Sequence, residues 1–268
     1  MERTLPPHFL GELMAPLQRA NVAFAALHPG ESGRRQPVHT VYGGAHLFQA
    51  DVAARLGGLA LAALDEHAPD AAALARAIGL ERAPESLQRT VYTRVREKLA
   101  REPVEDFRLD FEDGYGNRPD DEEDGHAVAA ARQIAAGMRG GGLPPFLGIR
   151  IKPLNEELRA RSVRTLDLVL GTLVREAGGL PPNFAINLAK VTIPEQVAAL
   201  ADLCDRFEPA LGLRAGTLRC ELMVETPQAI IADDGTIALP RLLAAARGRC
   251  VAAHFGTYDY TAGCNITA

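Results

Sequence analysis

Acidic residues stand at or just beyond the end of three short apolar segments of this 268-residue chain. The segments and their acids are 107–114 with Asp110, Glu112 and Asp113, 222–227 with Glu225, and 254–259 with Asp259. A continuous apolar run of this length is typical of a parallel strand that is buried on both faces. The carboxyl ends of such strands form the edge at which α/β folds bind their ligands. Several carboxylates meeting there would suit Mg²⁺, which prefers oxygen ligands.

Glu225 and Asp259 form the strongest pair of candidate metal ligands. Each stands at the end of its own predicted strand, with a helical stretch between them. Neighbouring parallel strands would bring the two carboxylates to one edge of the sheet, where substrate oxygens and water would complete the shell of Mg²⁺ or Mn²⁺. The alternative is two separate helix-capping acids. It fits Glu225 poorly, because Thr226 and Pro227 already begin the next segment.

Two basic residues are expected near these acids. Arg150 lies inside the apolar segment 146–151, and Lys190 lies near the end of the segment 184–191. Arg150 could pair with a neighbouring acid such as Glu112, could hold a substrate carboxylate in two parallel hydrogen bonds, or could do both. Lys190 could extend into solvent or neutralise charge at the site. A Schiff-base role is open to any lysine in principle, but nothing in the local sequence indicates it.

The remaining acids are interpreted by their position. The run 120–124 is predicted to be a solvated loop and helix amino terminus, where negative charge is favoured. Asp110 and Glu112 differ from that run, because strand alternation turns both to the same side. Acids on that side cost free energy unless a cation, water or hydrogen-bond donors balance them.

Alternating strands and helices are predicted to position these residues. Strands are expected at 38–42, 108–111, 146–151, 184–191, 219–224 and 250–255, and helices at 8–28, 47–64, 71–78, 85–101, 123–138, 156–176, 194–206 and 240–247. This alternation predicts an α/β fold with a parallel sheet. Six strands suit either an open doubly wound sheet or an unfinished (β/α)₈ barrel. Residues 1–36 are expected to form a helical extension, and residues 37–268 the α/β domain.

The composition excludes several other classes of protein. With 47% hydrophobic and 24% charged residues, the chain is predicted to be globular, and a net charge of −5 without a basic block argues against nucleic acid or a membrane surface as partner. The four cysteines show no metal-binding spacing and are expected to be reduced thiols. The amino terminus lacks the apolar core of a signal peptide, and no apolar run is long enough to span a membrane. A cytoplasmic location is therefore expected.

Five segments resemble the citrate lyase β-subunit and HpcH/HpaI aldolase family, which belongs to the phosphoenolpyruvate/pyruvate-type (β/α)₈ TIM barrel superfamily. The matching segments are 109–114 for its acidic second-strand motif, 149–151 for its Val-Arg-Ile-Asn-type third strand, 189–191 for its Pro-Lys-Val segment, 224–227 for its Ile-Glu-Thr motif, and 255–260 for its Phe-Gly-x-x-Asp-Leu motif. The resemblance runs from about Val38 to the end of the chain. It implies a TIM-type barrel, with about six of its eight strands present here.

The resemblance also implies roles for single residues. Glu225 and Asp259 would bind Mg²⁺, Arg150 with Lys190 would bind the substrate, and Glu112 with Asp113 would order water around the metal. The expected catalytic residues are Arg150, Glu112 and Asp113. The implied activity is that of a carbon–carbon lyase or aldolase. It would cleave or form a bond beside the carbonyl of a small oxo-acid or acyl-CoA-type substrate, with the metal stabilising the enolate.

The sequence departs from this family in several places. Lys152 replaces the Asn that follows the third-strand arginine, the segment 232–236 resembles an insertion, and the helical region before Asp110 is long. The chain ends at Ala268, where a full barrel would still need two strand–helix units, so we expect a fragment or a partner chain that covers the gap. A homo-oligomer is expected. The alternatives are phosphoenolpyruvate-type phosphoryl transfer at the same metal site, and an inactive barrel that serves as a binding or assembly subunit.

Overall fold

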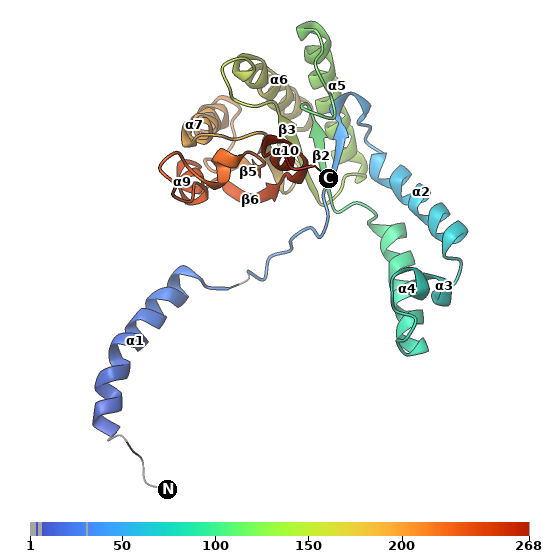
Figure 1. The fold of residues 1–268 in the computed structure, drawn as a ribbon. Helices are drawn as coiled ribbons and strands as arrows, with labels where there is room; N and C mark the ends of the chain where they lie inside the picture. Colours follow the sequence, from blue (N-terminus) through green and yellow to red (C-terminus); the bar gives the residue numbers. More distant parts are fainter. Residues whose placement is uncertain (1–3, 5–6, 31, 268) are drawn as a thin grey trace. The chain divides into compact units, whose positions relative to one another are not determined.

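The computed structural model describes residues 4, 7–30 and 32–267 (Figure 1). The chain divides into two compact units, Met1–Gln36 and Pro37–Ala268. The first contains helix α1 (Pro7–Leu27), whose larger apolar side chains are exposed. Among the described residues, no helix has the length and apolar character needed to cross a membrane.

The second unit is built on a parallel sheet of six strands in chain order, β1-β2-β3-β4-β5-β6. The strands are β1 (Val41–Gly44), β2 (Asp106–Asp110), β3 (Phe146–Ile151), β4 (Phe184–Leu188), β5 (Arg219–Val224) and β6 (Cys250–Phe255). The predicted α/β class with a parallel sheet is confirmed. Strands β1 and β6 do not pair with each other, so the sheet is open between them.

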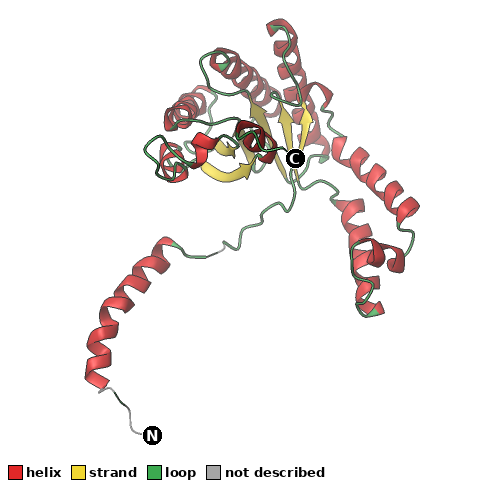
Figure 2. Cartoon of the chain, in the orientation of Figure 1, coloured by secondary structure: helices red, strands yellow, loops and turns green. Residues whose placement is uncertain are grey.

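The helices of the second unit either lie beside the sheet or project away from it (Figure 2). They are η1 (Ala45–Leu47), α2 (Val52–His67), α3 (Ala71–Ala77), α4 (Glu85–Arg101), α5 (Asp120–Gly140), α6 (Arg159–Ala177), α7 (Pro194–Ala210), α8 (Pro227–Ile230), α9 (Leu239–Ala245) and α10 (Thr257–Gly263). Helices α5 and α6 pack against each other beside the sheet, as do α7 and α9, whereas α2, α3 and α4 pack mainly among themselves and project away from it (Figure 1).

The two faces of the sheet have opposite chemistry. Residues that face the helices, such as Leu109, Ile149 and Ile186, form one buried core with helix residues such as Ile134 and Leu170. Successive side chains of a strand point to opposite sides, and several of those on the other face are charged or polar. These are Asp106, Arg108, Asp110, Arg150, Asn187 and Glu221, and all are buried.

The polar face lies on the concave side of a curved sheet. Arg108 on β2 donates to Glu221 on β5 through Nε at 2.9 Å and Nη2 at 2.7 Å, although two strands lie between them in the sheet. The Tyr42 hydroxyl on β1 likewise lies 3.6 Å from Sδ of Met223 on β5. Contacts between strands so far apart in the sheet require that it curl.

Four strand predictions need correction. β2 spans Asp106–Asp110, two residues earlier at its start and one residue earlier at its end than the predicted 108–111. β1 begins later than predicted and includes Gly43, where a Cβ would lie 2.6 Å from the Phe107 ring. Glycine therefore lets β1 approach β2 closely. β4 ends at Leu188, before the predicted end. The expectation of burial on both faces fails for β6, because the outer side chains of Val251 and Phe255 are 50% and 57% exposed.

Candidate functional site

The site lies at the carboxyl ends of the strands, and the structure brings together there the acids predicted from the sequence. Glu112 and Asp113 follow β2, Glu225 follows β5, and Asp259 lies in α10, directly after β6. Lys190, which follows β4, contacts all four. This edge is where parallel α/β sheets bind their ligands.

Arg150 is held by Asp110. Its Nε and Nη2 donate to Asp110 Oδ1 at 2.7 Å and Oδ2 at 2.5 Å, in the two-pronged geometry of an arginine–carboxylate pair. Its Nη1 lies 3.5 Å from Glu112 Oε2. The Asp110 carboxylate also accepts from the backbone N–H groups of Glu112 and Gly114. Arg150 therefore fixes the loop after β2, and its binding of a substrate carboxylate stays a prediction.

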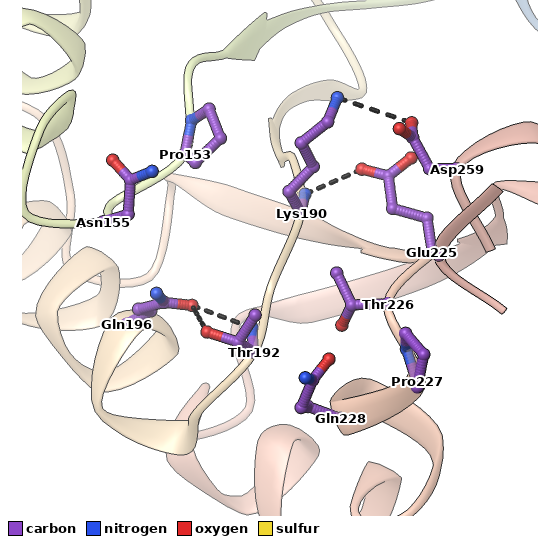
Figure 3. Close-up of a pocket in the computed structure, with 11 residues that line it drawn as sticks. Pro153, Asn155, Lys190, Thr192, Gln196, Glu225, Thr226, Pro227, Gln228 and Asp259 are labelled. Atoms are coloured by element: carbon purple, nitrogen blue, oxygen red, sulfur yellow. Dashed lines mark hydrogen bonds and ion pairs between the residues drawn. The ribbon is translucent and has the colours of Figure 1, made fainter. Parts of the chain in front are cut away.

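The Lys190 ammonium lies among three carboxylates. Its Nζ is 2.5 Å from Glu112 Oε1, 3.0 Å from Asp113 Oδ1 and 3.4 Å from Asp259 Oδ2. The backbone φ of Lys190 is +47°, in the left-handed region that few residues other than glycine adopt. In this turn the backbone N–H of Lys190 donates to Glu225 Oε1 at 2.7 Å (Figure 3). Lys190 thus neutralises charge at the site, and its binding of a substrate stays a prediction.

The pKa values of Glu112 and Asp113, the two acids of the loop after β2, shift in opposite directions. Burial raises the pKa of Glu112, and the hydrogen bond from Lys190 offsets this only in part. For Asp113 burial acts in the same direction, but hydrogen bonds with Glu112 and Lys190 prevail and lower its pKa. Lys190 itself is desolvated by burial, yet the two carboxylates raise its pKa, so its ammonium stays protonated.

Glu225 is buried, with 2% of its surface exposed. A Cβ at Gly256 would lie 2.5 Å from both Cβ and Oε2 of Glu225, so this close approach requires glycine. Burial raises the pKa of Glu225, the Lys190 N–H and ammonium lower it, and the neighbouring Asp259 and Glu112 raise it further. The pKa of Glu225 is therefore raised mainly by burial, and the nearby acids add to this.

A pocket of about 380 Å³ opens beside these acids. It is lined by Pro153, Asn155, Lys190, Thr192, Gln196, Glu225, Thr226, Pro227, Gln228, Asp259 and Gly263 (Figure 3). A smaller hollow of about 290 Å³ lies on the side of Glu112, Asp113 and Lys152. The larger pocket has the size of a small-molecule site.

The donor set of this pocket fits a hard divalent cation. Glu225 and Asp259 offer carboxylate oxygens, and burial with a smaller contribution from the nearby acids raises the pKa of Glu225, so a bound cation would stabilise its charged form. Within the described part of the chain, however, no three His, Cys, Asp or Glu side chains gather closely enough to hold an ion together. A cation held by Glu225 and Asp259 would therefore need water or substrate oxygens to complete its shell.

One acid of the run 120–124 was predicted wrongly. Glu123 was expected in solvent but is 1% exposed, and it accepts from Lys152 Nζ at 2.7 Å and from the Thr165 hydroxyl at 2.6 Å. Lys152 is buried at the end of β3, so its ammonium requires a carboxylate partner. The neighbouring Asp120 and Asp121 are exposed, as predicted.

Sequence reasoning missed the uncharged polar side chains of the pocket, which are Asn155, Thr192, Gln196, Thr226 and Gln228. Each lies in a loop or a first helical turn after a strand. Their place beyond strand ends was the available signal, but Asn, Thr and Gln are also common in loops that bind nothing.

Comparisons with known proteins give one family and several distant structures. The chain is similar to the malate synthase of Haloferax volcanii, with 18% identity and a TM-score of 0.42 to its lead(II) complex, over 60% of this chain and 44% of that one. For the magnesium/glyoxylate complex the identity is 17% and the TM-score 0.41, over 60% and 45%. The chain thus spans less than half of these malate synthase chains. No curated protein matches it. The model of the domain of unknown function DUF6986 matches residues 17–268, and the chain belongs to that family.

Proposed function

We propose that this protein is a Mg²⁺- or Mn²⁺-dependent enzyme that cleaves or forms a carbon–carbon bond beside the carbonyl of a small oxo-acid or acyl-CoA-type substrate. The supporting observation is the convergence of four carboxylates on Lys190 at the carboxyl ends of the strands. The segments that carry these residues are also those that resemble the HpcH/HpaI aldolase family.

In this proposal each residue of the site has its own role. Glu225 and Asp259 hold the cation, which when bound supplies Lewis-acid polarisation of a carbonyl. Glu112 and Asp113 hold the Lys190 ammonium and order water beside the substrate. The ammonium places positive charge where negative charge develops on a substrate oxygen. Arg150 fixes the β2 loop through Asp110 and offers its Nη1 edge to a substrate carboxylate.

The phosphoryl-transfer alternative has less support. A transferred phosphoryl group needs several cations or N–H donors around it. Among the described residues that line the larger pocket, Lys190 is the sole basic one. We therefore prefer the carbon–carbon chemistry.

A homo-oligomer remains part of the proposal. The outer side of β6 exposes the apolar side chains of Val251 and Phe255, and the adjoining Tyr258 is 91% exposed. Apolar side chains grouped on one surface favour contact with another chain. The partner is proposed to be a second copy of this protein.

Two measurements test the function. Titration with Mn²⁺, followed by the electron paramagnetic resonance of the free ion, should give a dissociation constant that rises at least about tenfold in Glu225→Gln and Asp259→Asn. The control Glu156→Gln, whose exposed carboxylate pairs only with Arg159, should bind as wild type does. Unchanged binding in both site variants would refute the metal site.

The second measurement follows the C3 protons of pyruvate in D₂O by NMR. Their exchange requires an enolate and should depend on added Mg²⁺, and it should be lost in Glu225→Gln. Metal binding without exchange of pyruvate and without turnover of acyl-CoA substrates would favour the inactive binding subunit. Release of phosphate from phosphoenolpyruvate would favour phosphoryl transfer.

A further inference from the structure

One wall of the larger pocket carries a side-chain amide whose orientation is fixed. Gln196 Oε1 accepts from the backbone N–H of Thr192 at 2.9 Å and lies 3.2 Å from its hydroxyl (Figure 3). A backbone N–H can only donate, so the amide oxygen must face it and the NH₂ group must face away. The half-buried Gln196 therefore presents two donor hydrogens on the pocket side.

Asn155 repeats this arrangement on the loop after β3. Its Oδ1 accepts from the backbone N–H of Leu158 at 2.9 Å, which again leaves the NH₂ group as a donor. In Figure 3 the nitrogen of Gln196 is turned to the side of the pocket on which Asn155 lies. Among the described residues, no acceptor binds either NH₂ group.

The charges in the pocket indicate which ligand group would bind to the NH₂ groups of Asn155 and Gln196. Glu225 and Asp259 make the opposite part of the lining acidic, so a negatively charged group is repelled there unless a cation is bound. The NH₂ groups of the two amides can only donate, and among the described lining residues Lys190 is the one that is basic. The Nε and Nη2 groups of Arg150 are occupied by Asp110. Oxygen acceptors, and above all a carboxylate, are the complement of this wall.

We infer that Asn155 and Gln196 form a subsite for a second carboxylate of the substrate, which makes the substrate a small dicarboxylic oxo-acid. This inference rests on the proposed function, because the reacting oxo-acid end then lies at the acidic wall. A pocket of about 380 Å³ holds such an acid whole. The two fixed amides determine specificity between oxo-acids that have this second carboxylate and those that lack it.

Calorimetry with two probes at saturating Mg²⁺ tests the subsite. Wild type should bind 2-oxoglutarate at least about tenfold more tightly than pyruvate, because hydrogen bonds to a charged group are added. In Gln196→Glu one carboxylate oxygen still accepts from Thr192, while the other replaces the NH₂ group and repels the ligand. Binding of 2-oxoglutarate should weaken at least about tenfold, and binding of pyruvate less than about twofold.

Two further variants make the test specific. Asn155→Asp should act as Gln196→Glu does, because Oδ1 can still accept from Leu158. Gln228→Glu adds the same charge to the same pocket at a side chain that no hydrogen bond from the described residues orients. It should therefore change 2-oxoglutarate binding less than about threefold.

The outcomes separate the subsite from the function. If wild type binds both acids equally, or if Gln196→Glu behaves as Gln228→Glu does, the subsite is refuted while the proposed function stands. A larger effect of Gln196→Glu on acetyl-CoA than on 2-oxoglutarate would also refute the dicarboxylate assignment. If neither oxo-acid binds in the presence of Mg²⁺, the subsite is refuted, and the proposed function is refuted with it if acetyl-CoA does not bind either.

Discussion

The buried pair Arg108–Glu221 should be the most sensitive electrostatic contact of the fold. The two side chains are 1% and 6% exposed and form two hydrogen bonds across the concave side of the sheet. His254 Nε2 lies 3.2 Å from the same carboxylate, and Asp106 pairs with Arg108 from the other side. In Glu221→Leu the guanidinium would remain buried with one carboxylate partner in place of two.

The size of the loss follows from this geometry. Breaking a buried ion pair by removing one partner costs about 3–5 kcal/mol of unfolding free energy. Because Asp106 still pairs with Arg108, we expect the lower end, about 3 kcal/mol, which lowers Tm by roughly 6–12 °C in a domain of this size. Glu156→Leu is the matched control, since its carboxylate is 86% exposed, and it should change the unfolding free energy by less than about 0.5 kcal/mol.

Thermal unfolding followed by circular dichroism measures both variants. A triple variant, Glu221→Leu with Arg108→Met and Asp106→Asn, removes the guanidinium and both carboxylates of the cluster. It should regain most of the lost stability, because replacement of a buried ion pair by uncharged side chains is close to neutral. If Glu221→Leu unfolds within about 2 °C of Glu156→Leu, the contact does not hold the sheet. If the triple variant is no more stable than Glu221→Leu, lost packing and not unpaired charge causes the effect.

Two other predictions concern pH and the glycine beside the site. Burial would raise the pKa of Glu221, but hydrogen bonds from His254 and Arg108 hold it at about 2, and Arg249 with two backbone N–H groups holds that of Glu208 at about 2 against burial. Both carboxylates stabilise the fold above their unfolded pKa near 4.5, and this stabilisation is lost as the pH falls toward 2. The unfolding free energy measured in urea should therefore fall more between pH 5 and pH 2.5 for wild type than for Glu221→Leu. An equal fall in both proteins would contradict this. Gly256→Ala should displace Glu225 and weaken Mn²⁺ binding at least about fivefold in the resonance titration, whereas Gly179→Ala, with open space around its Cβ, should not; equal affinities would show that Glu225 does not bind the ion.

Local pattern predicted much of the secondary structure. The strands β3, β5 and β6 and helix α4 have the bounds expected from the sequence, because turn or breaking residues border each of them. β1 was misplaced because its glycines were interpreted as a turn, whereas they permit close contact with β2. That requirement comes from the neighbouring strand, which lies far along the sequence.

The sequence predicted only those parts of the site that lie at the ends of strands. The gathering of Glu112, Asp113, Glu225 and Asp259 follows from their position at the ends of parallel strands. The pairing of Arg108 with Glu221 depends on the curvature of the sheet, which no local pattern encodes. The burial of Glu123 likewise depends on Lys152, an unusual residue for a strand end inside a core. The orientation of the Gln196 amide depends on a single backbone N–H group.

The balance of charge at the strand ends argues for a cation at Glu225. The acids there are Asp110, Glu112, Asp113, Glu225 and Asp259, and the bases are Arg150 and Lys190. Arg150 neutralises Asp110 in two hydrogen bonds, and the Lys190 ammonium is shared by three other acids. Within the part of the chain that the structure describes, Glu225 accepts a hydrogen bond from the backbone N–H of Lys190 but from no cationic side chain, although it is the more deeply buried of the two candidate ligands. A buried carboxylate in that position either takes up a proton or binds a cation. A divalent ion shared with Asp259 would offset most of the uncompensated charge, which is why Glu225 is the residue on which the proposed chemistry depends.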